Sequence, residues 1–128
     1  MQIWEQRLAN AGLAAGLVLM LLPSSAVAQQ VPTFTKDVAP ILQRSCQNCH
    51  RPGSIAPMSL LTYEEVRPWA RSIRNRVSKR EMPPWHVDRT IGIRKFKDDA
   101  SLSDQEVATV VAWIDGGTPR GNPGDMPP

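Results

Sequence analysis

The stretch "SCQNCHRPG", residues 45–53, contains both cysteines of this 128-residue chain, and a histidine directly follows the second one. A Cys-x-x-Cys pair serves three chemistries: a redox-active dithiol, half of a zinc site, or covalent attachment of haem. A plain disulfide between Cys46 and Cys49 is the structural alternative. The rest of the sequence has to distinguish among these possibilities.

The first 28 residues have the pattern of a secretory signal peptide. An apolar run extends from Ala11 to Leu22, and the small residues Ala26, Val27 and Ala28 follow it. This pattern predicts export, with cleavage after Ala28. The alternative is an uncleaved membrane anchor, but a membrane span needs about 20 apolar residues and this run is shorter. We therefore expect a periplasmic or secreted protein with no stable membrane insertion after cleavage.

The remaining residues, 29–128, are enough for a single domain. A domain of this size buries only about 60–65% of its unfolded surface, so its own core is marginal. Small exported domains often add several disulfides, but two cysteines separated by two residues cannot join distant segments. A buried cofactor would supply the missing core material.

Hydrophobic periodicity predicts helices and no convincing strand, hence an all-α fold of three main helices. The first helix is expected to run from Asp37, as N-cap, to the cysteine motif, with Pro40 in its first turn, where proline is tolerated. Thr62 and Glu65 form a capping box before the second region. Pro68 is expected to separate a short turn there from a helix over about residues 68–79.

The third helix has the clearest boundaries. Ser103 and Glu106 form another capping box, Leu102 can pack on Val107 across it, and Gly116 is expected as the C′ residue. We assign residues 29–119 to one domain and residues 120–128 to a flexible tail. The apolar residues expected to surround a cofactor are Val38, Ile41, Leu42, Ile73, Val77, Val110 and Ile114.

The context of the cysteines favours haem. A thioredoxin-like dithiol belongs at a strand-to-helix turn, whereas this motif ends a helix in an all-α chain. A structural zinc site needs four ligands, which Cys46, Cys49, His50 and the distant His86 would have to supply. Cys-x-x-Cys-His is the attachment motif of haem c. We therefore predict one covalently attached haem c.

The spacing of the motif also assigns roles. Thioether bonds from both cysteines would fix the macrocycle at the end of the first helix and hold His50 at the iron as an axial ligand. The other ring nitrogen of His50 should donate to a carbonyl, which fixes the tautomer and raises the basicity of the ligand. Our candidate acceptor is the carbonyl of Pro57. Here the chain resembles the class I cytochrome c family, in which a proline carbonyl after the motif has that role.

Met82, in "KREMPPWH", is the predicted sixth ligand of the iron. The two prolines that follow it cannot continue a helix and make its loop stiff. A methionine followed by prolines also resembles the distal segment of many small cytochromes c. Met82 could instead be an ordinary core residue, and His86, Met58 and Met126 are competing ligands. Met58 is close to His50 in sequence, and Met126 is in the expected tail.

The resemblance extends over most of the exported chain, from Phe34 to about Pro119. It is to the haem domain that precedes copper type II, ascorbate-dependent monooxygenase-like modules in some bacterial proteins. The matching segments are "FTKDVAPILQRSCQNCHRPGSIAPMSLLTYEEVRPWA", "REMPPWH" and "LSDQEVATVVAWIDGGTPRG". No copper module follows in this sequence, so only the electron-transfer role carries over. We expect a one-electron carrier and not an enzyme; the alternative is a haem enzyme or a gas or redox sensor with an open or bis-histidine iron.

Charge indicates the kind of partner. Between Arg67 and Lys97 there are ten basic residues against two acids, Glu81 and Asp88. Basic residues near the distal haem edge are expected to attract an acidic redox partner protein. The alternative is a solvated helix face with no partner. We expect a monomer, and nucleic acid is excluded as a partner by export.

Overall fold

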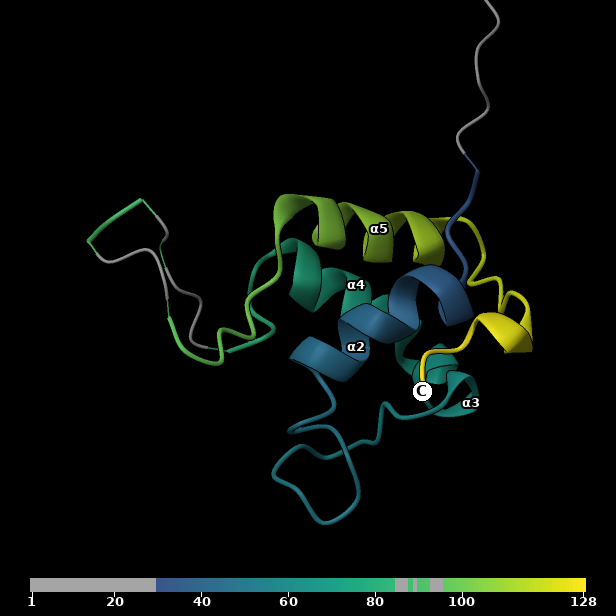
Figure 1. The fold of residues 1–128 in the computed structure, drawn as a ribbon, viewed down its shortest axis with the longest axis horizontal. Helices are drawn as coiled ribbons and strands as arrows, with labels where there is room; N and C mark the ends of the chain where they lie inside the picture. Colours follow the sequence, from purple (N-terminus) through teal and green to yellow (C-terminus); the bar gives the residue numbers. More distant parts are fainter. Residues whose placement is uncertain (1–29, 85–87, 89, 93–95) are drawn as a thin grey trace, which may run out of the picture.

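The computed structural model describes residues 30–84, 88, 90–92 and 96–128, and within them every regular element is helical and none is a strand. The elements are η2 (Phe34–Val38), α2 (Ala39–Ser45), α3 (Tyr63–Val66), η3 (Arg67–Trp69), α4 (Ala70–Ser78), α5 (Asp104–Asp115) and η4 (Pro123–Asp125) (Figure 1). The all-α prediction is confirmed for this part of the chain. The predicted signal peptide and His86 lie outside the described residues. Of the helices that are described, none has the length and apolar character needed to cross a bilayer.

The first helical segment begins earlier than the sequence predicts. Thr33 precedes the π-helical turn η2, and the Asp37 carboxylate accepts hydrogen bonds from the Thr33 backbone N–H (2.7 Å) and hydroxyl (3.2 Å). Asp37 therefore stabilises the start of the helix from inside it, and its assignment as the N-cap is wrong. Pro40 lies in the first turn of α2, directly after the π-helical turn η2.

The second helical region is divided around Pro68, as predicted. α3 opens with the expected capping box: the Thr62 hydroxyl accepts from the Glu65 N–H (3.2 Å), and the Glu65 carboxylate accepts from the Thr62 N–H (2.9 Å). Pro68 lies in the tighter 3-10 turn η3, and α4 begins only at Ala70. The long helix of this region therefore starts slightly later than the sequence suggests.

α5 also begins at its predicted capping box, in which the Glu106 carboxylate accepts from the Ser103 N–H at 2.8 Å. It ends at Asp115, one residue before Gly116. The residue with the left-handed backbone is Gly117, with φ of +88°, while Gly116 has φ of −80°. The prediction of Gly116 as C′ is therefore displaced by one residue, because either glycine of the pair satisfies the sequence pattern.

The core lies where η2, α2, α4 and α5 meet, and the ring of Phe34 is at its centre. The Phe34 ring centroid is 5.9 Å from that of Trp113 and 5.4 Å from that of Tyr63. Six of the seven apolar residues expected in the core are buried: Val38, Ile41, Leu42, Ile73, Val77 and Val110. The seventh, Ile114, is partly buried and packs against the same cluster.

The segment after α5 is attached to the first helix at its start. The Phe34 N–H donates to the Pro119 carbonyl (2.9 Å), and the Thr35 N–H donates to the Arg120 carbonyl (3.0 Å). Gly121 lies so close to Thr35 that a Cβ at this position would be 2.4 Å from the threonine hydroxyl. These contacts are backbone pairings between distant segments, which a local turn pattern does not reveal.

Candidate functional site

The cysteine motif continues α2 as one further helical turn. The Cys46 N–H donates to the Leu42 carbonyl (2.8 Å), and the N–H groups of Cys49 and His50 both donate to the Cys46 carbonyl (3.1 and 2.9 Å). Residues three and four apart on such a turn lie on the same side of it. Both cysteines are partly buried and both are free thiols. The turn thus places two thiols and an imidazole at neighbouring positions just after the C-terminal end of α2.

The imidazole of His50 has a carbonyl partner, but it is not the one predicted. His50 Nδ1 lies 3.2 Å from the carbonyl oxygen of Met58, the residue after Pro57. The acceptor is therefore one residue later in the chain than predicted, because the conformation of the loop decides which carbonyl faces the ring. A hydrogen bond from Nδ1–H to this oxygen leaves Nε2 unprotonated and available as a ligand.

The loop that supplies this carbonyl is fixed to the motif at several points. The Ala56 N–H donates to the Cys49 carbonyl (3.2 Å), and the Leu60 N–H donates to the His50 carbonyl (3.0 Å). The Gln47 side chain donates to the Leu60 carbonyl (2.9 Å), and Leu60 itself is buried. The loop is therefore held in one conformation around the imidazole, which the sequence alone did not indicate.

The environment of Cys46 argues against a redox dithiol. Burial raises the pKa of the Cys46 thiol to about 11, although Arg44 lowers it in part and Cys49 raises it further. Reactive dithiols have a lowered thiol pKa, because the thiolate is the nucleophile. Cys46, Cys49 and His50 are neighbours on this turn but do not converge on one point, because no group of three His, Cys, Asp or Glu side chains that could hold a metal ion is found in the described part of the chain. His86, the fourth zinc ligand considered, lies outside that part.

Two arginines hold the ends of α2 and α4 against the start of α5. Arg44, in the last turn of α2, forms an ion pair with Glu106 (2.9 Å). Arg80, just after α4, binds the carboxylate of Asp104. The cysteine motif follows Arg44 and Met82 follows Arg80, so both segments leave the helical core at the end where α5 begins (Figure 1). Sequence reasoning missed both arginines, and no local pattern marks them.

Met82 is held by its backbone while its side chain is partly free. Its N–H donates to the Arg76 carbonyl (3.3 Å), and the Glu81 N–H donates to the same oxygen (2.9 Å). The segment thus folds back over the C-terminal end of α4. The Met82 side chain is 39% exposed, which is more than a core residue would be. The interpretation of Met82 as ordinary core filling is therefore disfavoured.

Other large apolar side chains are exposed on the loops that leave this end of the core. Ile55, in the loop after the motif, is 87% exposed, and Ile91 and Phe96, in the segment between α4 and α5, are 70% and 46% exposed. Ile55 is thus in the loop that follows the cysteine motif, whereas Ile91 and Phe96 are in the separate segment that precedes α5.

The described residues of the basic block are spread over η3, α4 and the segment that follows α4. Arg74, Arg76 and Arg80 are paired with Asp115, Glu81 and Asp104 respectively. Arg67 begins η3, and Arg71 is in the first turn of α4. Of the described basic residues, Lys79 and Arg80 are the closest in the chain to Met82, whereas Arg89, Arg94 and Lys95 lie outside the described residues.

The Arg44–Glu106 pair predicts a pH dependence of stability. Burial raises the pKa of Glu106, but hydrogen bonds from Ser103 and the charge of Arg44 outweigh it and hold this pKa below its ordinary value. Because the pKa is lowered on folding, the stabilisation is complete above the unfolded pKa of about 4.3 and is lost as the pH falls through the folded value. Glu106→Gln should lower the free energy of unfolding by about 0.5–1 kcal/mol near pH 7.

Urea denaturation of the unmodified protein and of Glu106→Gln, from neutral to acidic pH, measures the difference between their free energies of unfolding. The difference should shrink as the pH falls below about 4.3. A difference that stays constant over the whole range would contradict the assigned role of Glu106.

Comparisons with known proteins give no match. No protein-family model matches the chain, and no curated protein and no solved structure is similar to it. The inference of a function therefore rests on the cysteine motif and on its geometry.

Proposed function

We propose that this protein is an exported monohaem c-type cytochrome that carries single electrons. The observation that carries the proposal is the turn at the end of α2, which brings Cys46, Cys49 and His50 together. In the same site His50 Nδ1 faces the Met58 carbonyl. This arrangement presents two thiols and one imidazole nitrogen from adjacent positions, as covalent attachment and axial ligation of haem c require.

The residues present fit this group. Cys46 and Cys49 would form the two thioether bonds, and His50 Nε2 would be the proximal ligand. The exposed side chains of Ile55 and Met82 would be shielded from water by the apolar macrocycle. Bound haem supplies a one-electron couple whose potential depends on its ligands and on its burial.

Each protein group has a defined role in this proposal. The Met58 carbonyl accepts the Nδ1–H of His50, which fixes the tautomer and makes Nε2 a stronger donor. Met82 would be the second axial ligand, since its backbone is fixed on α4 and its thioether is partly free. With both axial positions filled by protein, the iron would exchange electrons without binding a substrate, so we do not propose an enzyme.

We also propose an acidic protein as the redox partner. Lys79 is exposed at the end of α4, close in the chain to Met82, and no ion pair between it and another described residue is found. Positive charge at this end would speed the approach of an acidic surface, and the effect would weaken with salt.

Absorption spectra of the purified protein before and after reduction test the proposal. We expect the sharp bands of a low-spin haem c, a reversible one-electron potentiometric titration, and no rapid binding of carbon monoxide by the reduced protein. Rapid binding of carbon monoxide would contradict the carrier and favour an open iron site, as in a haem enzyme or sensor.

A further inference from the structure

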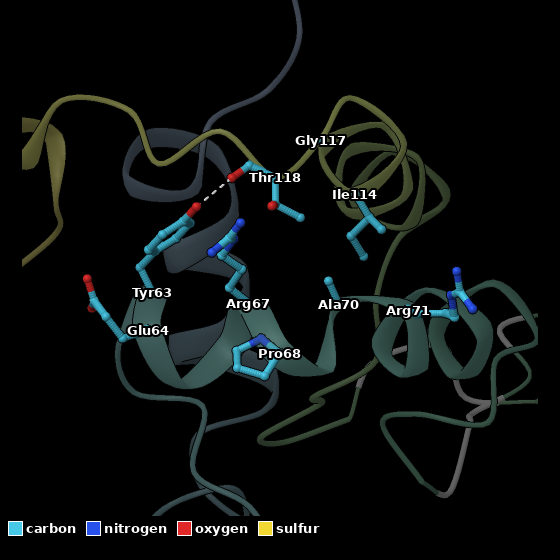
Figure 2. A pocket seen from close by; sticks show the side chains of 9 residues that line it. All are labelled: Tyr63, Glu64, Arg67, Pro68, Ala70, Arg71, Ile114, Gly117 and Thr118. Carbon is cyan, nitrogen blue, oxygen red and sulfur yellow. Dashed lines mark hydrogen bonds between the residues drawn. The ribbon is translucent and has the colours of Figure 1, made fainter.

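A groove lies at the C-terminal end of α5, whereas the cysteine motif is on the side of the molecule where α5 begins. Its volume is about 580 Å³, and it lies between the α3–α4 region and the segment that follows α5. Figure 2 shows its lining, in which Ala70 lies between Arg67 and Arg71 and faces Ile114 and Thr118. The volume is in the range of about 300–1,000 Å³ that is usual for small-molecule sites.

The groove carries a surplus of positive charge. Its one carboxylate, on Glu64, is paired with Arg120 at 2.9 Å. The nearby Asp115 is bound by Arg74 through two hydrogen bonds, of 2.6 and 2.9 Å. The acids around the groove are thus matched, while no ion pair links Arg67 or Arg71 to another residue in the described part of the chain. In Figure 2 the two guanidinium groups lie on opposite sides of Ala70, and only that of Arg67 lies beside Thr118. A single guanidinium can bind a carboxylate through two parallel hydrogen bonds.

The remaining walls of the groove are mostly apolar. Ala70 is buried and Ile114 is partly buried, and the ring of Pro68 lies at the edge. In Figure 2 the side chains of Ile114 and Thr118 point toward the space beside the Arg67 guanidinium. An inorganic anion would leave the apolar walls in contact with water, and a neutral ligand would leave the arginines without a counter-charge.

Thr118 is held in an unusual conformation at the rim of this groove. Its φ is +57°, a region that β-branched residues rarely adopt. Two hydrogen bonds fix it there: its N–H donates to the Trp113 carbonyl (2.9 Å), and its carbonyl accepts from the Tyr63 hydroxyl (2.9 Å). Glycine would adopt this backbone without strain, so the threonine side chain has a reason to be there other than the turn.

We propose that this groove binds a small organic monocarboxylate with an apolar body. The planar guanidinium of Arg67 would bind the carboxylate, the Thr118 hydroxyl would donate to it, and the apolar body would rest on Ala70 and Ile114. The groove and the cysteine motif are at opposite ends of α5, so the proposal does not depend on haem.

An NMR titration of the purified ¹⁵N-labelled protein with benzoate tests this proposal. We expect the amide signals of Ala70, Gly117 and Thr118 to shift, with a Kd on the order of 1 mM or tighter. Benzamide, which has the same shape without the charge, and inorganic phosphate, which has charge without an apolar body, should each bind at least about tenfold more weakly. Equal binding of either compound, or no shift up to about 10 mM benzoate, would overturn the proposal.

Variants assign the binding to Arg67. Arg67→Gln should weaken benzoate binding by about tenfold or more, because a charge-assisted hydrogen bond is lost. Arg76→Gln is the matched control, since Arg76 lies in α4 and is paired with Glu81 outside the groove. Thr118→Gly should keep the fold and weaken binding. Unchanged affinity in Arg67→Gln would overturn the assignment. If this variant does not fold, the comparison of benzoate with benzamide on the unmodified protein tests the role of the charge.

Discussion

Replacement of Cys46 and Cys49 together by alanine is expected to give a chain without covalently bound haem and without cooperative thermal unfolding. The domain has a small core, and Cys46 packs against that core at the end of α2. A domain of about this size buries only about 60–65% of its unfolded surface. The loss of a large apolar group from it would remove several kcal/mol from a total stability of about 5–15 kcal/mol.

Circular dichroism and thermal melting measure this effect. Asn48→Ala is the matched control, because Asn48 lies between the two cysteines but its side chain is exposed. It should keep both haem attachment and cooperative melting. A double cysteine variant with native helical content and a sharp melting transition would mean that the haem has no structural role.

Met82→Ala is expected to change the electronic properties of the site while the chain stays folded. Loss of a thioether ligand should lower the redox potential, because methionine ligation raises it. The shift should be on the order of tenths of a volt, since axial ligands set haem potentials over a range of about 0.8 V. The reduced variant should bind carbon monoxide, and the oxidised variant should lose the weak long-wavelength absorption band of sulfur bound to iron.

Two further variants distinguish Met82 from its competitors. Met126→Ala should leave the potential and the band unchanged, because Met126 follows η4 in the segment attached to the first helix. His86→Ala should also leave them unchanged. If His86→Ala opens the iron and Met82→Ala does not, the ligand set is bis-histidine.

The features predicted well from sequence are those that depend on neighbouring residues. The capping boxes at Thr62 and Ser103 are four-residue patterns, and both form as expected because each satisfies its own backbone groups. The predictions at Asp37 and Gly116 were close but displaced. The helix begins after Thr33, which is its N-cap in place of Asp37, and Gly117 has the left-handed backbone that was expected of Gly116. In each case two residues in the sequence could meet the requirement, and the packing of the helix selects one of them.

The features that could not be predicted depend on contacts between distant segments. Arg44 and Arg80 reach the start of α5 only after the helices have packed. The carbonyl that faces His50 is decided by the fold of a whole loop, so the sequence led to Pro57 where the structure has Met58. The attachment of the C-terminal segment to Phe34 is likewise a backbone pairing without a sequence pattern.

The most direct measurement of the central claim is the intact mass of the denatured protein, purified from a host that attaches haem c. The account predicts the mass of the exported chain plus one haem, with no thiol that reacts with an alkylating reagent. The account would be contradicted by a chain of unmodified mass. Such a chain could carry two reactive thiols, a Cys46–Cys49 disulfide, or a bound zinc ion that a chelator removes.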